Sequence, residues 1–233
     1  MSGLSANRKF PNGRNGKKIT TLPVTELANL TIRIEFSNGY RRNDYMAQKT
    51  ILVVIDGCRP DGIDKADTPT IDFMKASGSW SFDAVTVTPS ITLPAHFSIF
   101  TGKKPIGHNV LSNTGRPDIS PDTCSIFEVA RNSELCTAAF YSWEHLRNLA
   151  PPGVLERSAM INTINMMAEA QDRTIAETAV RTIRDIRPDF SFIYLEGTDI
   201  AGHEYGWMSE EYLLAVSRAD RALEIIIEGL PQD

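Results

Sequence analysis

The chain has 233 residues, of which 42% are apolar and 23% are charged, and its net charge is −5. These values are normal for a soluble globular protein with one sizeable core or two small ones. No run approaches the roughly 18 apolar residues that cross a bilayer, and the basic N-terminus lacks the apolar segment of a secretory signal. By default we therefore expect a cytoplasmic protein without a membrane segment.

Charge is distributed unevenly along the chain. Residues 1–49 carry nine Lys or Arg against three Asp or Glu, which leaves a net charge of −11 on the remainder. An acidic body suits a metal-binding site and argues against general nucleic-acid binding. Asn, Gly, Ser and Lys dominate the first 18 residues. We therefore predict a flexible or loosely packed leader over residues 1–48 and a domain over residues 49–233.

Strand and helix patterns alternate after this leader. In chain order we predict a possible edge strand at 30–36, a buried strand at 50–55, a helix at 68–77, a strand at 80–87, helices at 94–101 and 122–132, a strand at 135–141, a helix at 170–187, a strand at 188–195 and a helix at 209–229. This alternation predicts an α/β fold with a mostly parallel sheet sandwiched by helices. Ligands of such sheets bind beyond the carboxyl ends of the strands.

Two candidate residues stand at the end of a predicted strand and the start of a predicted helix. Asp56 ends the strand at 50–55, and its carboxylate can bind a metal, cap a turn or pair with Arg59, of which turn capping is the simplest interpretation. Thr92 precedes a helix, where its hydroxyl either caps the helix or faces a phosphate at the positive end of the helix. The local sequence leaves these alternatives open.

Asp199 and His203 form a second pair, four residues apart in what we expect to be a glycine-containing loop after the strand at 188–195. Their oxygen and nitrogen atoms suit zinc, although a surface Asp–His pair is an equal alternative. The other histidines show no comparable partners: His96, His108 and His145. Cys58, Cys124 and Cys136 form no C-x-x-C metal motif.

Four segments then appear in a recognisable order: Val-Val-Ile-Asp-Gly-Cys-Arg-Pro-Asp from residue 53, Thr-Leu-Pro-Ala-His-Phe-Ser-Ile-Phe-Thr-Gly from residue 92, Gly-His-Asn-Val from residue 107, and Gly-Thr-Asp-Ile-Ala-Gly-His-Glu-Tyr-Gly from residue 197. Together they resemble the type I phosphodiesterase/nucleotide pyrophosphatase family of the alkaline phosphatase superfamily, over roughly residues 50–230. The resemblance implies an alkaline-phosphatase-like fold. It also implies metal-dependent hydrolysis of phosphodiester or pyrophosphate bonds in a small phosphate ester such as a nucleotide.

The resemblance further implies two divalent metal ions, expected to be zinc. Asp56 and the Thr92 oxygen would serve one ion, and Asp199 and His203 the other. Thr92 would attack phosphorus and form a phosphothreonine that water then hydrolyses. Asn113 stands where the family places an amide that holds a phosphate oxygen, although it is also a common turn residue.

One part of the family pattern is missing. The family has a further Asp-His-Gly segment and a later histidine, whereas this chain contains no Asp-His dipeptide. We therefore expect a C-terminally incomplete fold, from a fragment or truncated product, with half-built metal sites and little activity. A phosphomonoesterase on the same scaffold and a non-catalytic metal- or phosphate-binding remnant remain alternatives. A sulfatase is disfavoured, because the segment from Thr92 to His96 has neither the cysteine nor the arginine of sulfatases.

Overall fold

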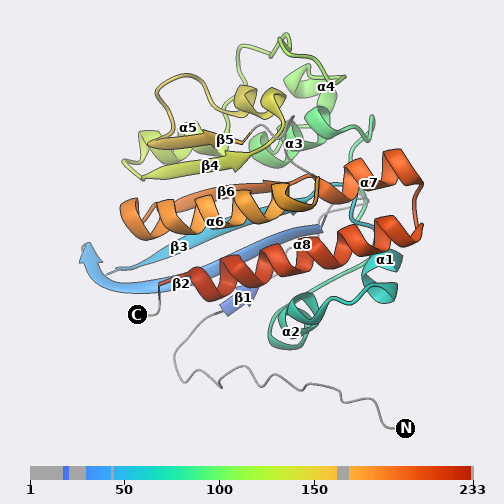
Figure 1. Ribbon diagram of the computed structural model, residues 1–233. Coiled ribbons are helices and arrows are strands. Elements are labelled where there is room, and N and C mark those ends of the chain that lie inside the picture. The colour runs from blue at the N-terminus through green and yellow to red at the C-terminus, as the bar shows by residue number, and fades with distance from the viewer. Residues whose placement is uncertain (1–17, 21–29, 43–44, 162–167, 232–233) are drawn as a thin grey trace, which may run out of the picture.

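The computed structural model describes residues 18–20, 30–42, 45–161 and 168–231, which build a six-stranded sheet flanked by helices (Figure 1). The strand order is β1-β2-β3-β6-β4-β5. The strands are β1 (Lys18–Thr20), β2 (Leu30–Arg42), β3 (Tyr45–Ile55), β4 (Thr137–Tyr141), β5 (Arg157–Met160) and β6 (Phe190–Leu195). The last four of the sheet order are mutually parallel, whereas β1 and β2 pair antiparallel with their neighbours. The mostly parallel sheet predicted from the sequence is confirmed.

Helices cover both faces of this sheet. They are α1 (Pro60–Lys65), α2 (Pro69–Ser77), α3 (Thr92–Thr101), α4 (Pro105–His108), α5 (Ile126–Asn132), the 3-10 helix η1 (Glu144–Leu149), α6 (Ala168–Ile186), α7 (Gly197–Tyr205) and α8 (Glu210–Gly229). Figure 1 shows α6 and α8 lying side by side across one face. No helix in the described ranges is both long and apolar enough to cross a membrane.

The alternation of side chains along β3 produces two cores. Ile51, Val53 and Ile55 pack with buried residues of α6 and α8 on one face. Leu52 and Val54 pack on the other face with the phenylalanines of α3 and α5. Since successive side chains of a strand point to opposite faces, a continuous apolar run predicts this two-sided burial.

Most predicted helices are confirmed, with shifted starts. The helix expected at 122–132 begins only at Ile126, because Ser125 and Glu128 form a capping box. The helix expected from residue 94 begins at Thr92 itself. Residues 170–187 and 209–229 correspond closely to α6 and α8.

The strand predicted at 80–87 is wrong: the segment is irregular, with one isolated bridge at Val85. Both edges of β3 are already paired, with β2 and with β6, so β3 offers this segment no free edge. Trp80 and Phe82 instead pack on each other and on the Lys75 ammonium group, which lies 5.0 Å from each ring. The leader predicted at 1–48 falls largely outside the described residues. Within it, the possible edge strand at 30–36 belongs to β2, which pairs with β3 on one side and β1 on the other.

Candidate active site

Asp56 follows β3 directly and is held at the carboxyl edge of the sheet by residues of the β6 segment. Its backbone N–H donates to the Leu195 carbonyl oxygen at 2.9 Å, and its own carbonyl oxygen accepts from the Thr198 hydroxyl. The Tyr194 hydroxyl donates to Asp56 Oδ2 at 2.5 Å. Burial, and secondly the charge of Asp56, raise the pKa of Tyr194 well above its usual value, so this phenol keeps its proton. One carboxylate oxygen of Asp56 is thereby fixed.

The turn after Asp56 depends on a glycine. Gly57 has φ +69°, a left-handed conformation that glycine adopts without steric cost. A Cβ atom at this position would lie 2.7 Å from the Cα atom of Asp199 and 2.9 Å from its backbone nitrogen. The missing side chain therefore lets the backbones that carry Asp56 and Asp199 approach each other closely.

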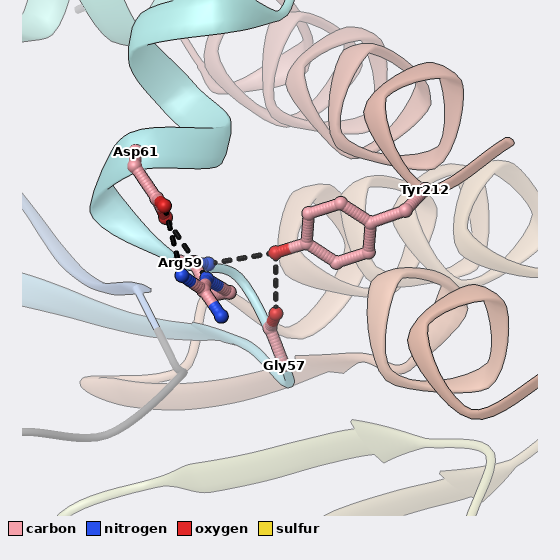
Figure 2. Close-up of polar contacts among 4 residues, drawn as sticks. All are labelled: Gly57, Arg59, Asp61 and Tyr212. Atoms are coloured by element: carbon pink, nitrogen blue, oxygen red, sulfur yellow. Dashed lines mark hydrogen bonds and ion pairs between the residues drawn. The ribbon is translucent and has the colours of Figure 1, made fainter. Parts of the chain in front are cut away.

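A tyrosine from α8 secures the same turn (Figure 2). The Tyr212 hydroxyl donates to the Gly57 carbonyl oxygen at 2.7 Å and accepts from the Arg59 backbone N–H at 2.9 Å. The side chain of Arg59 turns to Asp61 and forms a two-point ion pair at 2.8 and 2.9 Å. The pairing of Arg59 with Asp56, one of the alternatives that the local sequence left open, is therefore replaced by a pair with Asp61.

Asp199 and His203 lie on a helix, α7, and the expected loop is wrong. Their spacing of four residues places them on one face, where His203 Nε2 is 3.6 Å from Asp199 Oδ1. The glycines that disfavoured a helix have packing roles. A Cβ atom at Gly197 would meet Asp172 Oδ2 at 2.7 Å, and one at Gly202 would meet the Trp207 ring at 2.2 Å.

The start of α7 is anchored by Asp172 of α6. The buried Asp172 carboxylate accepts the backbone N–H of Glu196 at 3.0 Å and that of Gly197 at 3.3 Å, which satisfies two N–H groups of the first turn. Burial nevertheless raises the pKa of Asp172 to about 7, because the bonds to the two N–H groups offset the desolvation only in part.

In the part of the chain that the structure describes, the site gathers carboxylates that no lysine or arginine pairs with. Burial first, and then the charge of Asp56, raise the pKa of Asp199 to about 6, while His203 opposes the shift. Burial and Asp56 also raise the pKa of Glu196, whose carboxylate accepts from Ser142 and Gln171. A divalent ion would relieve this repulsion, and oxygen and imidazole ligands suit zinc.

The oxygen and nitrogen donors of the site are of the types that such an ion binds, and they come as two expected pairs, Asp56 with Thr92 and Asp199 with His203. Within the described residues, no group of three or more His, Cys, Asp or Glu side chains is arranged to hold a metal ion. Each expected ion thus has two donors from this part of the chain, whereas catalytic zinc usually takes three protein ligands.

Thr92 is half-buried at the first turn of α3, and Asn113 lies beside it on the exposed rim. The Leu93 backbone N–H donates to Asn113 Oδ1 at 2.9 Å. Since the amide oxygen is used in this bond, the amide nitrogen of Asn113 keeps two N–H donors for another acceptor. Because Leu93 uses its N–H in this bond and Pro94 has none, the donors for an anion beside the Thr92 hydroxyl are the Thr92 N–H and this amide.

His96 was missed as a site residue. It is fully buried one turn after Thr92, and its Nδ1 lies 2.7 Å from the Thr92 carbonyl oxygen. Its ring contacts the Tyr194 ring edge-on at 5.3 Å, and Tyr194 in turn binds Asp56. Its position four residues after Thr92 in a predicted helix was the available signal, because such residues share a face.

The structure therefore brings the candidates together in two groups. Asp56, Asp199 and His203 meet where β3 and β6 end, and Thr92 meets Asn113 at the start of α3. His96 and Tyr194 connect the groups. Across the described ranges, no hydrogen bond or ion pair joins Thr92 directly to a member of the first group.

Curated proteins with similar sequences are phosphodiesterases or nucleotide pyrophosphatases. Human ectonucleotide pyrophosphatase/phosphodiesterase family member 1 is 25% identical over 206 residues, which are 78% of this chain and 21% of that protein. The venom phosphodiesterase CdcPDE of Crotalus durissus collilineatus is 28% identical over 200 residues, which are 78% of this chain and 24% of that protein. The chain thus spans about a quarter or less of the length of these relatives.

Solved structures show the same fold. An inactive variant of murine ectonucleotide pyrophosphatase/phosphodiesterase 5 in complex with AMP aligns with a TM-score of 0.62 and 19% identity, covering 77% of this chain and 51% of that one. Phosphonoacetate hydrolase from Sinorhizobium meliloti with phosphonoformate aligns with a TM-score of 0.58 and 23% identity, covering 84% of this chain and 57% of that one. The model of the protein family described as type I phosphodiesterase / nucleotide pyrophosphatase matches residues 50–233 of this chain. The chain therefore belongs to that family.

Proposed function

We propose that this chain hydrolyses phosphodiester or pyrophosphate bonds of small, nucleotide-type esters, with Thr92 as nucleophile. One observation carries the proposal: Gly57 packs against the Asp199 backbone, so two carboxylates converge at the carboxyl edge of the sheet. Burial, and secondly the charge of Asp56, raise the pKa of Asp199 there. Membership of the family supports it. So does the AMP held by the inactive threonine-to-alanine variant of the murine relative.

The proposal includes two divalent metal ions, expected to be zinc. Asp56 and the Thr92 oxygen would hold one, and Asp199 and His203 the other. When bound, such ions polarise a phosphoryl oxygen and offset its negative charge. The fixed Asp56 Oδ2, bonded to Tyr194, leaves Oδ1 as the oxygen for a metal.

The residues of the chain perform the group transfer. The Thr92 N–H at the start of α3 and the Asn113 amide nitrogen bind phosphate oxygens and hold phosphorus against Thr92. The Thr92 oxygen bonds to phosphorus and gives up its proton to water, while the bond from phosphorus to the leaving oxygen breaks. With a nucleotide diester the nucleotidyl group stays on Thr92. Water then attacks phosphorus, the bond from phosphorus to the Thr92 oxygen breaks, and the nucleoside monophosphate leaves as the hydroxyl regains a proton.

A single-turnover experiment tests the proposal. The chain, saturated with zinc and in excess over a nitrophenyl nucleotide diester, is assayed for nitrophenolate release and, by peptide mass spectrometry, for the nucleotidyl group that stays on Thr92. Thr92→Ala should abolish both signals, and Thr92→Ser should keep part of them, because the oxygen remains. Thr101→Ala is the matched control, since this threonine ends the same helix and its hydroxyl bonds to the Phe97 carbonyl oxygen.

Two outcomes would contradict the proposal. Full turnover by Thr92→Ala would mean that water attacks phosphorus directly and that the Thr92 hydroxyl takes no part in the reaction. Faster turnover of nitrophenyl phosphate than of the diester would favour the phosphomonoesterase alternative on the same scaffold.

A further inference from the structure

One peptide group beside the candidate nucleophile is bonded by side chains at both of its polar atoms. The Thr92 carbonyl oxygen accepts from His96 Nδ1 at 2.7 Å, and the Leu93 N–H donates to Asn113 Oδ1 at 2.9 Å. The carbonyl of residue 92 and the N–H of residue 93 belong to the same planar unit. That unit is attached to the Cα atom that carries the Thr92 hydroxyl, so its orientation sets the backbone from which the hydroxyl projects.

The imidazole of His96 is not explained by packing alone. A carbonyl oxygen can only accept, so the hydrogen must lie on His96 Nδ1. The other ring nitrogen, Nε2, is fully buried and has no hydrogen-bond partner among the described residues. Burying an unpaired polar atom costs stability that a leucine at this position would avoid. Packing therefore does not explain why a histidine occupies this position, whereas its hydrogen bond to the Thr92 carbonyl oxygen does.

His96 also connects Thr92 to the carboxylate side of the site. Its ring contacts Tyr194 edge-on at 5.3 Å and Phe192 at 6.0 Å. Tyr194 donates to Asp56 Oδ2 at 2.5 Å. The imidazole of His96 thus packs on Tyr194, which orients Asp56, and also bonds to Thr92, the proposed nucleophile.

We propose that His96 is a positioning residue for Thr92: its Nδ1–H, together with Asn113 Oδ1, fixes the peptide plane after Thr92 and thereby the side-chain rotamer of the hydroxyl. The physical link is that the allowed χ1 rotamers of a residue depend on its φ and ψ angles. His96 touches neither phosphorus nor the leaving group. The inference rests on the proposed nucleophilic role of Thr92.

Isosteric variants separate the two ring nitrogens. His96→Asn places an amide N–H near the position of Nδ1, His96→Gln places one near Nε2, and His96→Leu keeps only the apolar volume. His108→Gln is a matched control, because His108 is equally buried but bonds to Ser98 and the Val110 N–H.

The first readout needs no turnover. In the chain labelled with ¹⁵N, imidazole correlation spectra should show one histidine, lost in His96→Asn, with its hydrogen on Nδ1. Scalar couplings of the Thr92 side chain, assigned with Thr92→Ala, should report one χ1 rotamer in the wild type, in His96→Asn and in His108→Gln. Averaged couplings are expected in His96→Gln and His96→Leu.

The second readout is the single-turnover rate. His96→Gln and His96→Leu should slow phosphoryl transfer by up to about a hundredfold, with substrate affinity unchanged, because misplacing a reacting group by about 1 Å costs about that much. His96→Asn should recover most of the rate.

The possible failures are distinguishable. A hydrogen on Nε2, or identical Thr92 couplings in all His96 variants, would overturn the positioning role whatever the activity. If Thr92→Ala stayed active while the couplings changed as expected, the contact would stand and the nucleophile assignment would fall.

Discussion

The hydroxyl of Tyr212 offers a sharp test of how the Asp56 turn is held. Tyr212→Phe removes one oxygen and keeps the ring, so the packing of this fully buried side chain in the core is preserved. The lost oxygen takes part in two hydrogen bonds, to the Gly57 carbonyl oxygen at 2.7 Å and to the Arg59 N–H at 2.9 Å.

The expected destabilisation follows from these two bonds. Each contributes about 0.5–1.5 kcal/mol net, and a buried backbone group that loses its partner costs about 1–3 kcal/mol. We therefore expect Tyr212→Phe to lower the free energy of unfolding by about 2–3 kcal/mol. At about 2–4 °C per kcal/mol for a chain of this size, the melting temperature should fall by about 4–12 °C.

Urea denaturation followed by tryptophan fluorescence measures this loss. Tyr141→Phe is the control, because Tyr141 is also buried but its hydroxyl has, among the described residues, one hydrogen-bond partner, Ser158 at 3.2 Å. It should cost about 1 kcal/mol. Equal effects of the two variants, or an effect of Tyr212→Phe below about 0.5 kcal/mol, would refute the view that this hydroxyl secures the turn.

Three further predictions concern the surroundings of the site. Gly57→Ala should destabilise the fold clearly more than Gly102→Ala in urea titrations, because both glycines have φ near +70° but only Gly57 faces a backbone within 3 Å. Because the pKa of Asp172 is raised to about 7, the folded state keeps this proton up to about pH 7, whereas the unfolded chain loses it near the ordinary pKa of 3.8. The free energy of unfolding should therefore fall as the pH rises from 3.8 to about 7. Asp172→Asn should flatten the urea midpoint against pH there, and parallel profiles would contradict the assignment. Zinc should change the emission of Trp207, whose ring lies 5.5 Å from that of His203, and an unchanged response in His203→Ala would disprove this metal site.

The sequence predicted correctly the strand segments that are buried on both faces. The apolar run at 50–55 and the run at 188–195 have one environment along their length, so their periodicity reports the fold directly. The exposed edge strand β5 was missed because Arg157–Met160 carries no apolar pattern. The strand predicted at 80–87 was wrong because residue types that favour strands do not reveal whether a sheet edge is available.

The candidate site shows the same division. The positions of Asp56 and Thr92 at the ends of elements were readable, because strand ends and helix starts have local signals. The helix at Asp199 was not, since its two glycines count against a helix locally and are explained only by the distant Asp172 and Trp207. The hydrogen bond of His96 to Thr92 joins residues four apart and could be inferred from the helix. That its Nε2 has no partner among the described residues depends on how the core packs and could not be predicted from the sequence.

The contacts that hold Asp56 join residues far apart in the sequence, and this separation determines when the site can form during folding. Its bonds with Tyr194 and Thr198 close loops of 138 and 142 residues, and the Tyr212 bond to Gly57 closes one of 155. Contacts between residues so far apart along the chain are costly to close and slow to form. The carboxylate pair therefore comes into existence only after β6 has paired with β3 and α8 has docked. Any ion that needs both carboxylates binds the completed fold alone, so it would slow unfolding more than it speeds folding.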